Sequence, residues 1–115
     1  MLRKISKFYM DRDTLYRQHI LDAAGTIEGF ISGKTFEDFS SSKLLQDAVL
    51  HEVQIIGEAA KRLSNEFKDK YDVPWRKIVA TRDKLVHDYF KVDLIVIWDT
   101  AKDDVPILKQ KLQSD

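Results

Sequence analysis

Apolar residues recur every three to four positions along most of the chain, which is the spacing of amphipathic α-helices. The first such stretch covers residues 11–32 and is followed by Gly33, a residue that readily adopts the left-handed conformation in which helices end. The second stretch covers residues 42–70, and the serines at positions 40–42 are candidate N-caps for it. The pattern therefore predicts two long helices in the first 70 residues.

Two details qualify these helices. Residues 34–40 are expected to form a loop in which Phe36 and Phe39 pack against the core. Gly57 lies in the middle of the second helix, where glycine costs about 1 kcal/mol of helix propensity relative to alanine. We therefore expect the backbone of another helix to approach closely at Gly57.

The rest of the chain predicts two more helices. Pro74 suits the first turn of a third helix, which runs to about residue 88. Asp93 is a natural N-cap for a fourth, which Pro106 should kink or restart, with Asp104 as a local cap. The chain shows no period-two strand pattern and no hairpin signal. The fold class is therefore all-α, an antiparallel bundle of four to five helices in a single domain of residues 1–115.

The composition favours a cytoplasmic protein. Hydrophobic residues make up 43% of the chain and charged residues 33%, as in ordinary soluble domains. There is no cysteine, which excludes disulfides and thiolate metal sites. The N-terminal segment is basic, but acidic residues follow before any apolar run develops, so no secretory signal is expected. No stretch approaches the roughly 20 apolar residues of a membrane span, so no membrane association is expected.

The charge balance argues against a protein that coats nucleic acid. The 19 basic residues equal the 19 acidic ones, whereas such proteins are usually strongly basic. Residues 76–91 are locally basic, with five Lys or Arg against two Asp. This segment is either a local anion-binding site or an ordinary solvated helix face.

Most familiar catalytic patterns are missing from the sequence. His19, His51 and His87 fall on three different predicted helices, and none forms the i, i+4 pair of a helical zinc site. No glycine-rich phosphate loop is present. The acidic pair Asp103-Asp104 stands beside a proline and is more typical of a helix cap than of a metal ligand. We therefore expect no metal or other cofactor.

The remaining candidate chemistry lies in residues 81–90. Arg82, His87 and Tyr89 place a permanent cation, a group that titrates near neutrality and a phenol within eight residues. Cleavage of a phosphodiester needs a base, an acid and a cation that stabilises the charged phosphorane. The planar guanidinium of arginine fits phosphate oxygens well.

Helical geometry leaves the role of this trio open. At about 100° per residue, Arg82 and His87 lie roughly 140° apart on an ideal helix, whereas Arg82 and Tyr89 nearly coincide. His87 joins Arg82 only if the helix ends or tightens there, or if two chains share the site. Alternatively, His87 is a surface histidine paired with Asp83, four residues before it. Glu52, which falls inside the apolar stripe of the second helix, is either an edge carboxylate or a partly buried acid that pairs with a basic site residue.

The order of these residues is similar to a known family. The string Arg82-x4-His87-x-Tyr89 resembles the R-x4-H-x-Y signature of HepT toxins, which belong to the HEPN superfamily. The segment Ile55-Ile-Gly-Glu-Ala-Ala-Lys-Arg-Leu63 also resembles HepT sequences. Further similar segments are residues 17–21, 46–50, 74–75, 89–90 and 92–94. The resemblance covers roughly residues 13–112.

The resemblance implies a fold and an activity. HepT-like proteins are helical bundles that dimerise and bring two copies of the Arg/His motif together across a cleft. Their chemistry is metal-independent endoribonuclease action on RNA, in which the 2′-hydroxyl attacks and a cyclic phosphate forms. His87 would then be the general acid/base, and Arg82 would bind phosphate and stabilise its charge. Whether the homodimer assembles further stays open.

The resemblance gives Tyr89 a different role. In this family a cognate minimal nucleotidyltransferase of the MntA type, the antitoxin, attaches AMP to the motif tyrosine. A bulky anion there would block the cleft and repel the phosphates of RNA, because added charge acts on its neighbours as phosphorylation does. The alternative is a tyrosine whose ring packs while its hydroxyl stays in water.

Two positions depart from the family pattern. Asp83 stands where many relatives have an uncharged polar residue, so it either holds His87 and raises its pKa or repels RNA. Lys91 stands where glycine is common, which puts the shape of the turn after the motif in doubt. The competing hypothesis is therefore a helical module that binds a nucleotidyltransferase or RNA without cutting it, for which the zero net charge and Asp83 are the best support.

Overall fold

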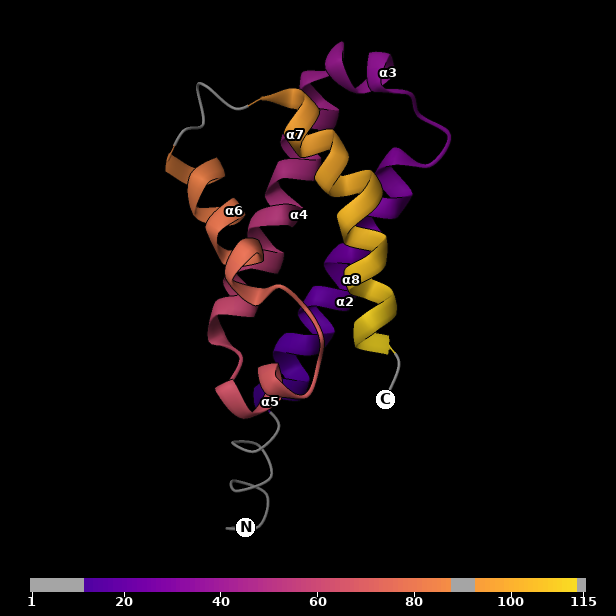
Figure 1. Ribbon diagram of the computed structural model, residues 1–115. Coiled ribbons are helices and arrows are strands. Elements are labelled where there is room, and N and C mark those ends of the chain that lie inside the picture. Colours follow the sequence, from indigo (N-terminus) through magenta and orange to yellow (C-terminus); the bar gives the residue numbers. More distant parts are fainter. Residues whose placement is uncertain (1–11, 88–92, 114–115) are drawn as a thin grey trace, which may run out of the picture.

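The computed structural model describes residues 12–87 and 93–113, and these residues form a bundle of helices with no β-strand among them (Figure 1). The all-α prediction is confirmed. In chain order the elements are α2 (Arg12–Ile31), α3 (Phe36–Ser40), α4 (Lys43–Arg62), α5 (Asn65–Asp69), α6 (Trp75–His87), α7 (Leu94–Asp99), the π-helical turn η2 (Thr100–Asp104) and α8 (Val105–Gln113).

Helix α4 lies at the centre of the bundle and packs against α2 and α6, while α2 also packs against α8 (Figure 1). The buried face of α2 follows helical spacing, with Ile20, Ala24 and Ile27 fully covered. The buried residues of α4 recur at the same spacing and meet those of α2, α7 and α8 in one apolar cluster. Helix α6 follows α4 in the opposite direction, so its residues face α4 in reverse order.

The helix predicted over residues 42–70 is interrupted, and this part of the prediction is wrong. Helix α4 ends at Arg62, Leu63 adopts an extended conformation, and α5 begins at Asn65. Ser64 caps α5 by accepting a hydrogen bond from the Phe67 amide (3.1 Å). The amide and hydroxyl of Ser64 also donate to the Asp13 carboxylate, at 2.8 and 2.6 Å. The break is therefore stabilised by a contact with α2.

The loop predicted over residues 34–40 contains the short helix α3. Thr35 and Asp38 form a capping box at its start, in which each side chain bonds to the backbone of the other residue. Phe39 is fully buried and packs on Trp98 of α7, with ring centroids 5.4 Å apart, whereas Phe36 stays partly exposed. The core contact expected of this segment is therefore present, but a helix makes it.

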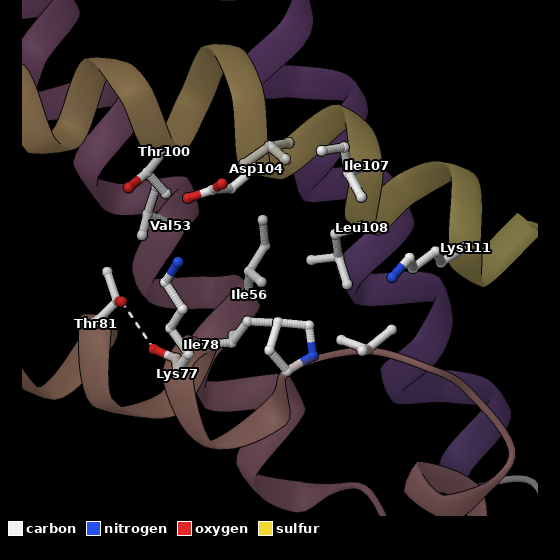
Figure 2. Close-up of a pocket in the computed structure, with 13 residues that line it drawn as sticks. Val53, Ile56, Lys77, Ile78, Thr81, Thr100, Asp104, Ile107, Leu108 and Lys111 are labelled. Atoms are coloured by element: carbon white, nitrogen blue, oxygen red, sulfur yellow. Dashed lines mark hydrogen bonds between the residues drawn. The ribbon is translucent and has the colours of Figure 1, made fainter.

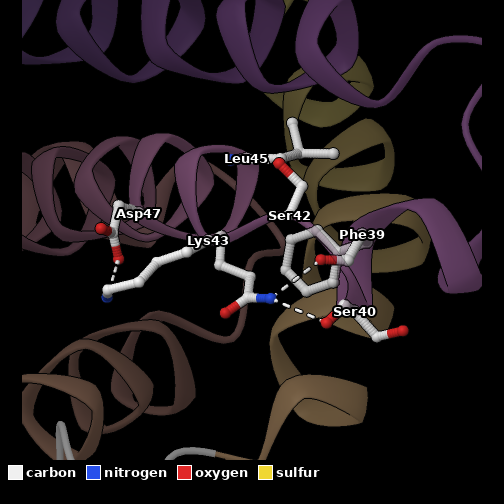
Figure 3. Close-up of polar contacts among 7 residues, drawn as sticks. Phe39, Ser40, Ser42, Lys43, Leu45 and Asp47 are labelled. Atoms are coloured by element: carbon white, nitrogen blue, oxygen red, sulfur yellow. Dashed lines mark hydrogen bonds and ion pairs between the residues drawn. The ribbon is translucent and has the colours of Figure 1, made fainter.

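Helix α4 begins where the serines predicted it. Ser42 accepts a hydrogen bond from the Leu45 amide (3.1 Å), and the first turn also carries an ion pair between Lys43 and Asp47 (3.3 Å) (Figure 3). The side chain of Gln46 donates to the carbonyls of Phe39 and Ser40, at 3.0 and 3.1 Å. These bonds attach α3 to the start of α4. Gly33, with a φ of +71°, provides the predicted end of α2.

The last helix begins and is interrupted as the sequence predicts. Asp93 caps α7 by accepting a hydrogen bond from the Ile95 amide (2.9 Å). The π-helical turn η2 ends at Asp104, and Pro106 is the second residue of α8, where the missing N–H and the bulk of the ring prevent a regular α-helical turn before it. The chain then continues as α8 without a loop (Figure 1). No helix within the described residues is long and apolar enough to cross a membrane.

Candidate active site

Arg82 lies on the face of α6 that packs against α4, and its side chain occupies the space above Gly57. A Cβ placed on Gly57 would lie only 2.2 Å from Arg82 Cβ and 2.4 Å from Arg82 Cγ. Another helix does approach Gly57 closely, as expected, but it does so through side-chain atoms and not through its backbone. The contact is made by the aliphatic part of the Arg82 side chain, so only glycine fits there without a shift of the two helices.

Two carboxylates hold the guanidinium of Arg82. Glu58 on α4 pairs with Nη2 at 3.1 Å, and Asp83 accepts a hydrogen bond from Nη1 at 2.9 Å. Arg82 Nε is buried and has no hydrogen-bond partner among the described residues. The side chain as a whole is 24% exposed. The guanidinium is thus fixed in direction while part of it faces solvent.

Glu58 also holds a second arginine. Its Oε1 pairs with Arg62, one turn further along α4, at 3.1 Å from Nη2. Arg62 in turn lies over the ring of Tyr16 on α2, 6.0 Å from the centroid. The hydrogen bond from Arg62 is the main cause that lowers the pKa of Tyr16. A continuous row of polar contacts therefore runs from α2 across α4 to Arg82 on α6.

Asp83 is bound to Arg82. The hydrogen bond from Arg82 is the main cause that lowers the pKa of Asp83, with smaller contributions from the positive charges of Lys61, Arg82 and His87. The structure gives no hydrogen bond between the described side chains of Asp83 and His87. No hydrogen bond therefore supports the interpretation in which Asp83 holds His87.

His87 is the last described residue of α6, and its side chain is exposed. Helix α6 is regular from Trp75 to His87, so Arg82 and His87 stay about 140° apart around the helix axis. A tighter turn between them is therefore not the way in which the two groups meet. Tyr89 and Lys91 lie outside the described residues.

Glu52 is half-buried on α4 and forms no ion pair with any described residue. The carboxylate of α4 that reaches Arg82 is Glu58, six positions later. Glu52 was singled out because it falls inside the apolar stripe of the helix. The signal that could have identified Glu58 is its neighbour Gly57, because a glycine in mid-helix indicates close packing by another helix. No group of three or more His, Asp or Glu side chains within residues 12–87 and 93–113 is arranged to hold a metal ion.

A family model described as "Ribonuclease HepT-like" matches residues 20–114 of the 115-residue chain. This chain belongs to the HepT-like ribonuclease family. The match includes α4 and α6 and therefore Glu58, Arg82 and His87. The resemblance found in the sequence is confirmed at the level of the family.

Curated relatives of this HepT-like chain agree with the assignment. A "Probable ribonuclease HepT" of Thermococcus cleftensis is 44% identical over 99 residues, which are 85% of this chain and 90% of that protein. A protein of Caldanaerobacter subterraneus subsp. tengcongensis, provisionally named an RNase, is 38% identical over 85% of this chain and 88% of its own length. No solved structure matches the chain.

A longer relative shows that the family occurs within larger proteins. A protein of Methanocaldococcus jannaschii, named a gamma-glutamylcyclotransferase and, provisionally, an RNase, is 44% identical over 85% of this chain. The HepT-like chain spans only 45% of the length of that protein.

The HepT-like chain also carries a pocket apart from Arg82 and His87. It measures about 240 Å³ and lies between α4, α6 and the segment η2–α8 (Figure 2). Its lining is mostly apolar and includes Ile56, Ile78 and Leu108, and the hydroxyl-bearing Thr81 also lines it (Figure 2). Neither Arg82 nor His87 lines it. The candidate catalytic groups therefore lie outside this pocket.

Proposed function

We propose that this HepT-like chain is a metal-independent endoribonuclease that acts as the toxin of a toxin–antitoxin pair. The observation that carries the proposal is the state of Arg82. Helix α4 fixes its side chain while part of its guanidinium faces solvent, and His87 follows on the same helix, α6. A cation with a set direction and a histidine able to transfer protons are the two groups that this cleavage needs. The family assignment supports the same activity.

The reaction follows from these groups. His87 accepts the proton of an RNA 2′-hydroxyl, whose oxygen then bonds to the adjacent phosphorus. Arg82 stabilises the added negative charge on the phosphorane. The 5′-oxygen leaves with a proton from an imidazolium, which gives a 2′,3′-cyclic phosphate and a 5′-hydroxyl. Neither group needs a metal ion for its part.

We propose further that two chains form a cleft that holds two copies of the motif. Arg82 and His87 of one chain point in directions about 140° apart, so a second chain that faces the first supplies the missing partner for each group. This arrangement would complete a site that one chain leaves divided.

The proposed control is modification of Tyr89 by a nucleotidyltransferase of the MntA type. An AMP group attached to the tyrosine would place a phosphate close to the motif, where it would compete with the phosphates of RNA for Arg82. The nucleotidyltransferase would thereby act as the antitoxin.

Two measurements test the proposal. RNA cleavage in EDTA should be present for the wild-type chain, absent for His87→Ala and unchanged for His19→Ala, an exposed histidine on α2. Intact mass, with and without the neighbouring nucleotidyltransferase, should show added AMP that is lost in Tyr89→Phe and retained in Tyr71→Phe. If unmodified wild-type protein leaves RNA uncut and its mass never changes, the helical binding module is the correct alternative.

A further inference from the structure

We propose that Glu58 is a positioning residue of the active site, and that its carboxylate sets the direction in which Arg82 meets an RNA phosphate. This inference rests on the proposed ribonuclease activity and adds a residue to it. Glu58 itself touches no reacting atom and acts through Arg82.

Consecutive residues of α4 hold the two parts of the Arg82 side chain. Gly57 leaves the space that the Cβ and Cγ of Arg82 fill, so the aliphatic part has little freedom to move. Glu58 binds Nη2 at 3.1 Å, and so restricts the guanidinium at the end of that confined stem. A side chain held at both places presents its planar fork in one orientation.

The bonds to carboxylates leave part of the guanidinium able to bind a ligand. Each Nη carries two N–H groups; Asp83 accepts a hydrogen bond from one of those on Nη1, and Glu58 forms an ion pair with Nη2. No described residue accepts the second N–H of either nitrogen. A phosphate can therefore bind Arg82 while both carboxylates stay in place, in the orientation that they impose.

The exposure of the Glu58–Arg82 ion pair indicates that its main effect is to orient Arg82 and not to stabilise the fold. The side chain of Glu58 is 41% exposed and that of Arg82 is 24% exposed. Ion pairs this close to solvent are screened and contribute little to folding. Loss of the Glu58 carboxylate should therefore affect catalysis far more than it affects the melting temperature.

Arg62 provides a matched control, because it binds the other oxygen of the same carboxylate. Arg62→Gln removes one arginine from Glu58 and leaves the contact with Arg82 intact. A general disturbance of this surface would affect Glu58→Gln and Arg62→Gln alike. A specific effect on Arg82 would appear only in Glu58→Gln and Glu58→Ala.

The experiment compares these full-length variants in cleavage of an end-labelled pool of random-sequence oligoribonucleotides, with melting temperatures recorded in parallel. We expect kcat to fall roughly tenfold to hundredfold in Glu58→Ala, as in enzymes whose reacting groups are misplaced by about 1 Å. Glu58→Gln should lose less of its kcat, because its amide oxygen can accept a hydrogen bond from Nη2 of Arg82. In an Arg82→Gln background, Glu58→Ala should cause no further loss of kcat.

Three results would overturn the inference. Glu58→Ala could cleave as fast as wild type, or faster, which would make the carboxylate a mere competitor of RNA. It could lower kcat equally in the Arg82→Gln background, or it could melt far earlier than Arg62→Gln.

Wild-type protein that cuts nothing would instead refute the proposed function. The NMR signal of Arg82 Nε–H would then still test the inference, because it should change in Glu58→Gln and stay unchanged in Arg62→Gln.

Discussion

Arg82 sits among charges of both signs. Glu58 and Asp83 bind it directly, while the charge of Lys61 acts on Asp83 from α4. The chain as a whole is neutral, so any attraction for RNA has to come from local arrangements of this kind. The charges of single residues around Arg82 therefore matter more for the proposed function than the total charge does.

The pH dependence of stability should report the bond between Asp83 and Arg82. That bond lowers the pKa of Asp83 in the folded chain below its usual value of about 3.9. A lowered carboxyl pKa stabilises the fold above the unfolded-state pKa, and the stabilisation is lost as pH falls through the folded-state pKa. Asp83→Asn should therefore melt slightly earlier than wild type at pH 7, and the difference should shrink in acid.

Thermal unfolding followed by circular dichroism between pH 2 and pH 7 measures this difference. Asp69→Asn is the control, because Asp69 is exposed at the end of α5 and forms no ion pair with a described residue. A difference in melting temperature between Asp83→Asn and wild type that persists or grows at the lowest pH would contradict this prediction.

Helix spacing predicts which elements form better than it predicts where they are interrupted. The C-terminal end of α2 and the start of α4 follow from Gly33 and Ser42, whose effects are local. The end of α4 was missed because Leu63 continues the apolar pattern, while the contact that favours the break joins Ser64 to Asp13, 51 residues away. A partner that distant is invisible to a pattern read over a few turns.

Substitution of glycine by alanine should have opposite effects on stability at Gly57, which α6 covers, and at the two glycines of α2, which no described neighbour covers. Gly57→Ala gains about 1 kcal/mol of helix propensity, but its Cβ would collide with Arg82, and overpacking of this kind typically costs about 1–3 kcal/mol. We expect a net loss of stability of up to about 2 kcal/mol. Gly25→Ala and Gly29→Ala on α2 meet no atom within 4 Å and should each gain up to about 1 kcal/mol.

Urea denaturation of the three variants gives their free energies of unfolding on one scale. The decisive quantity is the difference in sign between Gly57→Ala and the two substitutions on α2. Stabilisation by Gly57→Ala equal to that by Gly25→Ala would mean that α4 and α6 are not in the close contact described above.

At the scale of the whole molecule, the sequence identified the candidate site only in part. Arg82 and His87 stand out because their chemistry is unusual for one short segment and because their order resembles a family signature. Gly57 and Glu58 complete the surroundings of Arg82, but which residue of α4 faces α6 depends on how the two helices are aligned. A helical wheel contains no such information, which is why Glu52 was singled out instead.

The separation of Arg82 and His87 around α6 leads to a prediction about assembly. If each site takes Arg82 from one chain and His87 from the other, the variants Arg82→Ala and His87→Ala are each inactive alone. Mixed dimers of the two contain one site with both wild-type groups and one site with neither. Random exchange makes half of the dimers mixed, so the mixture should recover about a quarter of wild-type activity.

The test is to unfold the two purified variants together, refold them and measure RNA cleavage, with each variant refolded alone as the control. Mass measurement of the refolded sample under native conditions shows whether mixed dimers have formed. Mixed dimers that remain inactive would mean that Arg82 and His87 of the same chain work together, and α6 would then have to change its shape when RNA binds. Recovered activity would place the catalytic site between two chains, so that only the assembled dimer is toxic.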